Sequence, residues 1–142
     1  MSDLKVQVQC ALRNPIVVSM NEYRGQKRLD ARHHYTGDDG ELHPTKKGIS
    51  VPLDAAMELV IALEGVEASP DNTKTLVQVA IDVREPVHIS VAPYKNVLRL
   101  DVRHYYEEGG SMQPGSKGIN LPWAERQALL NALYQVLAEP VA

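Results

Sequence analysis

The sequence predicts an α+β fold of two ββββα repeats, each a four-stranded antiparallel sheet with one helix, packed helix to helix as an intramolecular pseudo-dimer. The octet RLDARHHY at residues 28–35 returns as RLDVRHYY at residues 99–106, an offset of 71. Matching residues flank both octets, at an offset of 71 before them and 70 after a one-residue deletion. Each repeat also passes from strand-like alternation to an apolar, helix-like segment. The chain therefore divides into repeats at residues 1–70 and 71–142.

The first repeat contains four predicted strands and a helix. Apolar and polar side chains alternate in the first of these strands, which is typical of a half-buried strand. Turn signals at Arg13-Asn14-Pro15 and Gly25-Gln26 and a loop over residues 36–40 separate the strands. Pro52 opens a helix that ends near Gly65. The predicted strands are residues 5–12, 16–24, 27–35 and a short fourth strand at 46–51.

The second repeat follows the same order after a linker at residues 67–73. Its helix is expected from about Pro122 to Leu137. The connections between strands are too short for crossovers, so both sheets should be antiparallel. The predicted strands of this repeat are residues 76–84, 88–95, 98–106 and 117–121.

Both predicted helices are apolar around most of their circumference. In the first, only Asp54, Glu58 and Glu64 form a thin polar stripe. A helix this apolar is buried on more than one side. We therefore expect each helix to cover its own sheet and to pack on the other helix, so that both helices lie between the two sheets and each sheet keeps an outer face open to solvent.

Composition restricts the function classes only in part. The chain has 15 Lys and Arg against 18 Asp and Glu, a formal charge of -3. The first half carries 8 basic and 10 acidic residues and the second 7 and 8. Neither half is basic, so net charge gives no support to nucleic-acid binding. The single cysteine, Cys10, excludes an internal disulfide framework and suits a reducing compartment.

The N-terminal residues MSDLKVQVQ lack the apolar run of a signal peptide, and no segment reaches the length of a membrane span. We expect a soluble protein of the cytoplasm, nucleoid-associated if the source is bacterial, with no membrane contact.

Strand alternation places charged residues on the open face of the sheet. Leu29 and Ala31 should face the helix, while Arg28, Asp30 and Arg32 face outward. The second repeat has the same pattern in Arg99, Asp101 and Arg103. In one interpretation the aspartate holds the guanidinium groups so that they present their donors to phosphate. In the other, the three residues form a solvated cross-strand ion-pair network that contributes little.

Tyrosines and lysines add to this face. A Lys-Gly pair recurs in register, at Lys47-Gly48 and Lys117-Gly118, and Lys46 precedes the first of them. Cations that follow phosphates, with exposed rings that stack on unpaired bases, are what single-stranded nucleic acid requires. Tyrosine is also a good strand residue, which is the alternative explanation. The tyrosines in or at the ends of the strands are Tyr23, Tyr35, Tyr94, Tyr105 and Tyr106.

The residues indicate no enzyme, metal or cofactor. His33 and His34 are adjacent in a strand and point to opposite faces, and His43 is replaced by Gln113 in the copy. No zinc motif, phosphate-binding glycine loop or catalytic triad appears in both copies. Asp30 and Asp101 are paired with arginines, which would keep them ionised and make them poor general acids.

Taken together, the motifs resemble the single-stranded-DNA-binding domain of the transcriptional coactivator positive cofactor four family. The resemblance covers residues 16–66 and 87–137. In the first copy it rests on Ser19, Glu22-Tyr23-Arg24-Gly25, Leu29-Asp30, Arg32, Tyr35 and residues 44–51 (PTKKGISV). In the second it rests on Ser90, Tyr94-Lys95, Leu100-Asp101, Arg103, Tyr106, Pro114 and residues 117–121 (KGINL).

The resemblance implies a curved sheet backed by a helix, with subunits that pair through their helices and sheets that form channels for DNA. The tandem arrangement is also similar to the plant Whirly proteins. The implied nucleic-acid-binding residues, with Arg28 and Arg99 added because they replace a usually apolar residue, are Tyr23, Arg24, Arg28, Arg32, Tyr35, Lys46, Lys47, Tyr94, Lys95, Arg99, Arg103, Tyr106 and Lys117.

The chain departs from the family pattern at several positions. The family's lysine after the turn glycine is Gln26 here and Val97 in the copy, and Lys46 becomes Ser116. Tyrosine replaces the family's tryptophan at the end of the third strand, and we expect no basic or serine-rich N-terminal tail of the family's kind. The second copy is therefore expected to bind more weakly than the first.

The leading hypothesis is a non-catalytic, largely sequence-independent transcriptional coactivator or regulator that binds single-stranded DNA, with RNA left open as a ligand. It could also contact the transcription machinery, as a monomeric pseudo-dimer or a homodimer of it. The alternative is a protein-interaction module of the same fold, in transcription or replication, that binds no nucleic acid.

Overall fold

The computed structural model describes residues 5–8, 14–66, 75–79 and 86–138. The first repeat is a four-stranded antiparallel meander followed by a helix, as the sequence predicts. Its strands are β1 (Lys5–Val8), β2 (Ile16–Tyr23), β3 (Gln26–Thr36) and β4 (Leu42–Pro52), and its helix is α1 (Leu53–Gly65).

The second repeat has the same order of strands. These are β5 (Thr75–Val79), β6 (Val87–Tyr94), β7 (Val97–Glu108) and β8 (Ser111–Pro122). A 3₁₀ turn at Trp123–Glu125 then leads into α2 (Arg126–Ala138). The two ββββα repeats of the predicted fold class are therefore confirmed. The predicted boundary between them, at residues 70 and 71, lies outside the described residues.

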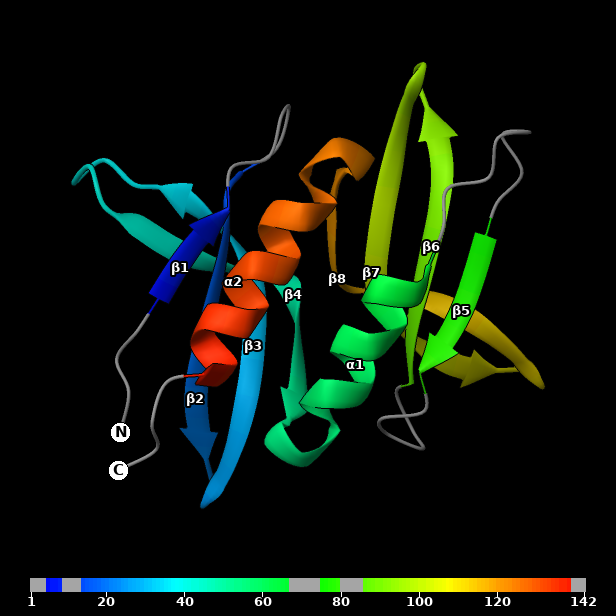
Figure 1. Ribbon diagram of the computed structural model, residues 1–142, viewed down its shortest axis with the longest axis horizontal. Coiled ribbons are helices and arrows are strands. Elements are labelled where there is room, and N and C mark those ends of the chain that lie inside the picture. The colour runs from blue at the N-terminus through cyan, green and yellow to red at the C-terminus, as the bar shows by residue number, and fades with distance from the viewer. Residues whose placement is uncertain (1–4, 9–13, 67–74, 80–85, 139–142) are drawn as a thin grey trace.

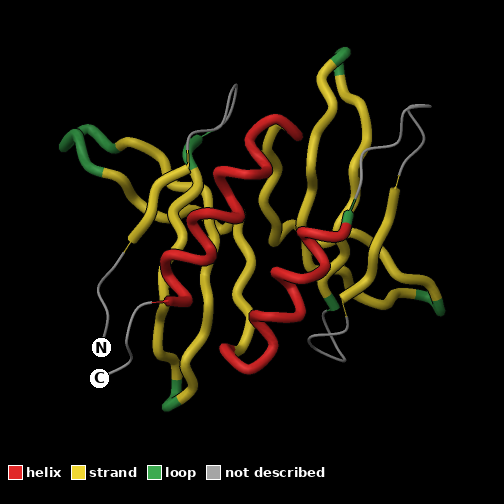
Figure 2. The backbone as a smooth tube through the Cα atoms, viewed as in Figure 1, coloured by secondary structure: helices red, strands yellow, loops and turns green. Residues whose placement is uncertain are grey.

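The sheets lie side by side, with β4 of the first next to β8 of the second, and both helices cross the same face (Figures 1 and 2). The expectation that the helices lie between two facing sheets is therefore wrong, whereas the expected contacts of α1 with α2 and with its own sheet are present. α2 packs on β1 and β2 of the first repeat, and α1 contacts β5 of the second as well as β3 and β4 of its own. Because the sheets meet edge to edge, each helix can bury its broad apolar surface across the junction.

The core is formed by alternate strand residues and the inner faces of the helices. In β3, Leu29 and Ala31 are buried, and Ile49 and Val51 of β4 lie beside them. Leu59 and Leu63 of α1 fill the space above the sheet, with Leu129 and Leu133 at the matching positions of α2. One core cluster contains residues from both repeats, so the repeats share a core, as small units of this size require.

Two buried histidines join the repeats by equivalent hydrogen bonds. The backbone N–H of Asn120 in β8 donates to Nε2 of His33 (3.2 Å), and the N–H of Ser50 in β4 donates to Nε2 of His104 (3.4 Å). His33 also binds the carbonyl of Asn14 through Nδ1 (2.7 Å). His33 and His104 are matching positions of the two octets, so the same contact is made twice across the junction.

Several predicted boundaries need correction. The fourth strand of each repeat is far longer than expected, because residues 42–45 and 111–116 continue the hairpin with the third strand. The turn after β2 consists of Arg24 and Gly25 instead of Gly25 and Gln26. The second helix begins with a 3₁₀ turn. The ends of the predicted strands 5–12 and 76–84 lie outside the described residues.

Neither helix in the described part of the chain is long and apolar enough to cross a membrane.

Candidate nucleic-acid interface

The face of each sheet opposite the helices carries the predicted charged residues. The register places Ser19, Asp30 and Ser50 side by side across β2, β3 and β4, with Val17, Arg32 and Gly48 in the next row. All of these alternate with the core residues, so they point away from the helices. The predicted division of the octet between core and open face is therefore confirmed.

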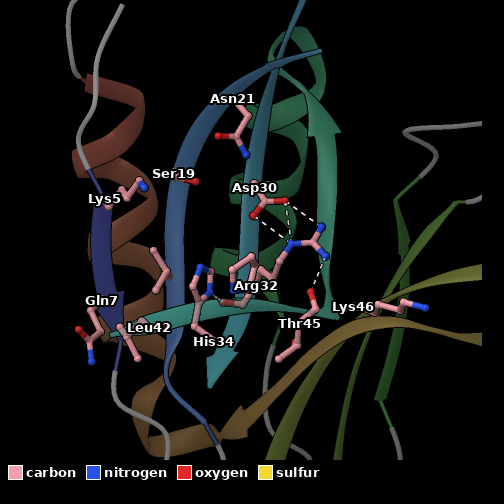
Figure 3. Close-up of a pocket in the computed structure, with 12 residues that line it drawn as sticks. Lys5, Gln7, Ser19, Asn21, Asp30, Arg32, His34, Leu42, Thr45 and Lys46 are labelled. Atoms are coloured by element: carbon pink, nitrogen blue, oxygen red, sulfur yellow. Dashed lines mark hydrogen bonds and ion pairs between the residues drawn. The ribbon is translucent and has the colours of Figure 1, made fainter. Parts of the chain in front are cut away.

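Arg32 is fixed on this face by two neighbours (Figure 3). Its Nη2 forms an ion pair with the carboxylate of Asp30 at 3.0 Å, and Nη1 donates to the carbonyl of Thr45 at 2.9 Å. Asp30 is only 7% exposed, so this is a partly buried pair, unlike a flexible surface pair. A guanidinium has five N–H donors; Asp30 and Thr45 engage Nε, Nη1 and Nη2 once each, which leaves two for a ligand.

The second repeat contains the same unit. Nη2 of Arg103 lies 2.9 Å from the carboxylate of Asp101, and Nη1 donates to the carbonyl of Gly115 at 2.8 Å. The hydrogen bond to Asp101 raises the pKa of Arg103, so this guanidinium keeps its charge at every physiological pH. Each unit thus holds one permanent cation against a bulge in the neighbouring strand.

The bulge explains why the arginine binds a carbonyl. Arg32 pairs with Gly48 and His34 with Pro44, so His33 faces Thr45, Lys46 and Lys47 together. The equivalent shift lies between Arg103 and Tyr105 in the second repeat. Extra residues leave unpaired backbone groups and bend the strand. The arginine satisfies one such carbonyl, and the bend presents the exposed side chains of Lys46 and Lys47 at the edge of the face.

The glycine of the recurring Lys-Gly pair is required for steric reasons, because it lies beside the bulge and opposite the arginine. A Cβ atom on Gly48 would lie 2.7 Å from Cβ of Arg32, and one on Gly118 would lie 2.7 Å from Cβ of Arg103. The glycines therefore allow each arginine to cross the neighbouring strand. The close approach at these glycines comes from the protein's own arginine side chain.

In the first octet the other arginine, Arg28, does not share Asp30 with Arg32, contrary to the interpretation that Asp30 holds both. Arg28 donates from Nε to Oγ of Ser50 (2.8 Å), from Nη2 to its carbonyl (3.0 Å), and from Nη1 to Gln26 (2.6 Å). Its counterpart Arg99 is 6% exposed and donates to Asn120. Each of these arginines thus binds the residue that lies directly across from the aspartate, Ser50 in the first repeat and Asn120 in the second.

A groove of about 810 Å³ runs over the first sheet (Figure 3). Its wall contains the cations Lys5, Arg32 and Lys46 and one carboxylate, that of Asp30. Among the described residues of its wall, three cations stand against one anion, so this part of the groove is basic even though the whole chain is acidic. The remaining lining residues are Gln7, Val17, Ser19, Asn21, His34, Leu42, Pro44 and Thr45.

The matching part of the second sheet has a smaller pocket of about 180 Å³, beside Tyr105, Tyr106 and Lys117. Here the rings of His88 and Tyr105 stack with their centroids 3.9 Å apart. The first repeat has Val17 and His34 at these two positions. This stacked pair has no counterpart in the first repeat, and neither residue was among the predicted site residues.

A tyrosine and a basic residue lie together at the tip of the β2–β3 hairpin and again at the tip of the β6–β7 hairpin. Tyr23 is 62% exposed and Tyr94 is 59% exposed. The guanidinium of Arg24 lies 5.2 Å from the ring centre of Tyr23, and Nζ of Lys95 lies 5.5 Å from that of Tyr94. Arg24 and Lys95 both have φ of 50° in two-residue turns, a conformation that normally favours Gly or Asn. The basic residue at each tip is therefore held in a disfavoured backbone conformation.

The predicted site residues do not all lie together. Arg32 and Lys46 line the groove and Lys47 lies in its bulge, whereas Tyr23, Arg24, Tyr94 and Lys95 lie at or beside hairpin tips on opposite sides of the molecule (Figure 1). Tyr35 and Tyr106 are 47% and 42% exposed. Sequence reasoning missed Lys5, Asn21 and Thr45. The first two could have been found from strand register, while Thr45 required knowledge of the bulge.

Comparison with known proteins places both repeats in one family. A family profile described as Transcriptional Coactivator p15 (PC4) matches residues 10–62 and again residues 80–132. A Neurospora crassa protein, named "Putative RNA polymerase II transcriptional coactivator", is 39% identical over 51 residues. The alignment covers 36% of this chain and 30% of that relative, so the relative is mostly composed of sequence outside the match.

Proposed function

Because the chain belongs to the p15 (PC4) transcriptional coactivator family, we propose that it binds single-stranded DNA on the open faces of its two sheets, as a non-catalytic regulator of transcription. The observation that carries this proposal is the basic groove on the first sheet, where Arg32 is held in place by Asp30 and the bulge. Fixed guanidinium donors suit phosphate. Binding by phosphate contact and stacking is largely independent of sequence.

The arrangement also favours a single strand over a duplex. The exposed Tyr35 and Tyr106 lie at the outer ends of β3 and β7, where unpaired bases could stack on their rings. Stacking contributes about 1–3 kcal/mol per base in proteins that bind single strands. A duplex keeps its bases paired and inaccessible, so it would receive only the phosphate contacts.

The test is fluorescence anisotropy with labelled oligo-dT, a matched duplex and oligo-U at low and moderate salt. We expect oligo-dT to bind more tightly than the duplex, with affinity that falls steeply with salt, because each phosphate contact releases counterions. Oligo-U gives the preference between RNA and DNA. Affinity for oligo-dT no greater than that of an acidic control protein would exclude the proposal.

A second candidate function is protein contact through the helical face. Met57 and Ile61 are 50% and 63% exposed and lie one turn apart on α1, beside the exposed Asp54 and Glu58. Exposed apolar side chains on a helix face are a common feature of protein interfaces. If the protein does not bind oligo-dT in the assay above, protein contact through the helical face becomes the better-supported function.

A further inference from the structure

The junction of the two sheets contains a basic pocket that neither repeat forms alone. We name it the seam pocket; it has a volume of about 320 Å³. Arg28, Arg32 and Lys46 contribute from the first repeat, and His104, Ser116 and Lys117 from the second. Among the described residues that line it are four Lys or Arg and no Asp or Glu. An anionic ligand is the chemical class that such a wall favours.

The two arginines of this pocket are positioned before any ligand arrives. Arg28 is held by Ser50 and Gln26, and Arg32 by Asp30 and Thr45. Each guanidinium makes bonds through Nε, Nη1 and Nη2, so two of its five donors remain. Because the partners already fix the side chains, an anion that accepts the remaining donors costs little conformational entropy.

The seam pocket shares its walls with the cavities on either side. Arg32 and Lys46 also line the groove on the first sheet. Ser116 and Lys117 also line the smaller pocket on the second sheet. The three cavities therefore form one series of adjoining surfaces from the first repeat to the second, with the seam pocket in the middle.

We propose that the seam pocket binds a backbone phosphate of a single strand at the point where it passes from one repeat to the other, so that one strand occupies both. This inference rests on the proposed function and adds the path that the DNA strand takes between the repeats. The pocket is also asymmetric: Arg28 and Lys46 lie in it, whereas Ser116 stands at the position matching Lys46. Separate subunits of an exact homodimer could not carry this difference.

The test compares variants at matched positions of the repeats. Lys117→Gln removes a cation from the seam pocket, while Lys47→Gln removes the matching lysine of the first repeat, which lies outside it. Ser116→Lys adds a cation at the position that matches Lys46. Each variant is titrated with oligo-dT of roughly 6 and roughly 20 nucleotides, since one single-strand-binding unit covers about 4–16. Thermal unfolding shows whether each variant is folded.

We expect the wild type to bind the longer strand more tightly, and Lys117→Gln to weaken that binding on the order of tenfold with little effect on the shorter strand. Lys47→Gln should weaken both by the same factor, and Ser116→Lys should strengthen only the longer. If Lys117→Gln does not fold, Ser116→Lys decides alone. Equal effects on both lengths, or an unchanged Ser116→Lys, would overturn the shared path. A wild type that binds neither strand would instead overturn the proposed function.

Discussion

At the scale of single residues, the duplicated arginine has a structural contact as well as a proposed ligand. Arg32 and Arg103 each bind the carbonyl of a bulge residue and an adjacent aspartate. The ion pair is partly buried and lies within one strand, unlike the solvated cross-strand network of one interpretation, while the phosphate-binding interpretation stays a prediction. The pair is a fixed element of the sheet, and it still leaves donors on the open face.

Gly48 should be intolerant of any side chain. A Cβ atom there would lie 2.7 Å from Cβ and 2.8 Å from Cγ of Arg32, so Gly48→Ala must displace the arginine or the bulge. We expect the free energy of unfolding to fall by about 1–3 kcal/mol, as measured by urea denaturation. Gly65→Ala is the matched control, since nothing lies within 4 Å of its Cβ position. Equal stabilities of the two variants would contradict the steric argument.

Arg24 should lower the stability of the fold, because its position at the hairpin tip requires a positive φ. Its φ is 50° and the next residue, Gly25, has φ of 78°, which suits an Asn-Gly turn. We expect Arg24→Asn to raise the free energy of unfolding by roughly 0.5 kcal/mol while it weakens oligo-dT binding. Lys95→Asn in the second repeat should behave alike. A less stable Arg24→Asn would show that the contact with Tyr23 outweighs the backbone strain.

At the scale of elements, the face that each strand residue occupies was more predictable than the length of the strands. The alternation at Leu29, Asp30 and Ala31 is enough to assign faces, and the structure agrees. The bulge could not be predicted, because it depends on a contact between two strands. The carbonyl of Thr45 in β4 accepts a hydrogen bond from the side chain of Arg32 in β3 instead of a backbone N–H. A sequence pattern within one strand contains no information about that contact. The long fourth strands were missed for the same reason.

The β3–β4 hairpin should depend on pH through Asp39. Its carboxylate accepts the N–H of Glu41 (3.0 Å) and Nε2–H of His43 (3.0 Å), and these bonds, the first above all, lower its pKa below the ordinary value of 3.8. A lowered pKa in the folded state means that the stabilisation is complete above 3.8 and is lost as the pH falls through the lowered value. NMR titration of the Glu41 amide should show this transition below pH 3.8. A midpoint at or above that pH would contradict the contact.

At the scale of the whole molecule, the duplication was predictable and the crossing of the helices was not. Apolarity around α1 predicted burial on several sides, but Met57 and Ile61 on its outer face are exposed, and the sequence does not state which sheet each helix covers. The structure joins each helix to the other repeat and joins the sheets through His33 and His104. The repeats therefore depend on one another for their core.

Loss of a seam histidine should destabilise the entire fold. His33→Leu would leave the N–H of Asn120 without its acceptor, at a cost of about 1–3 kcal/mol. His34→Leu is the matched control, since its ring binds the carbonyl of Arg32 within its own strand and the change should stay within about 0.5 kcal/mol. Thermal unfolding followed by circular dichroism measures both. Equal losses would mean that the junction does not rely on His33.

The central claim, that single-stranded DNA lies on the open faces of the sheets, is tested most directly by NMR mapping of isotopically labelled protein with oligo-dT. We predict amide shifts at Arg32, Lys46, Lys47 and Lys117, which line the grooves and bulges. The outer face of α1, around Met57 and Ile61, should stay unchanged. Shifts confined to α1 and α2, with none on the open faces, would contradict the claim.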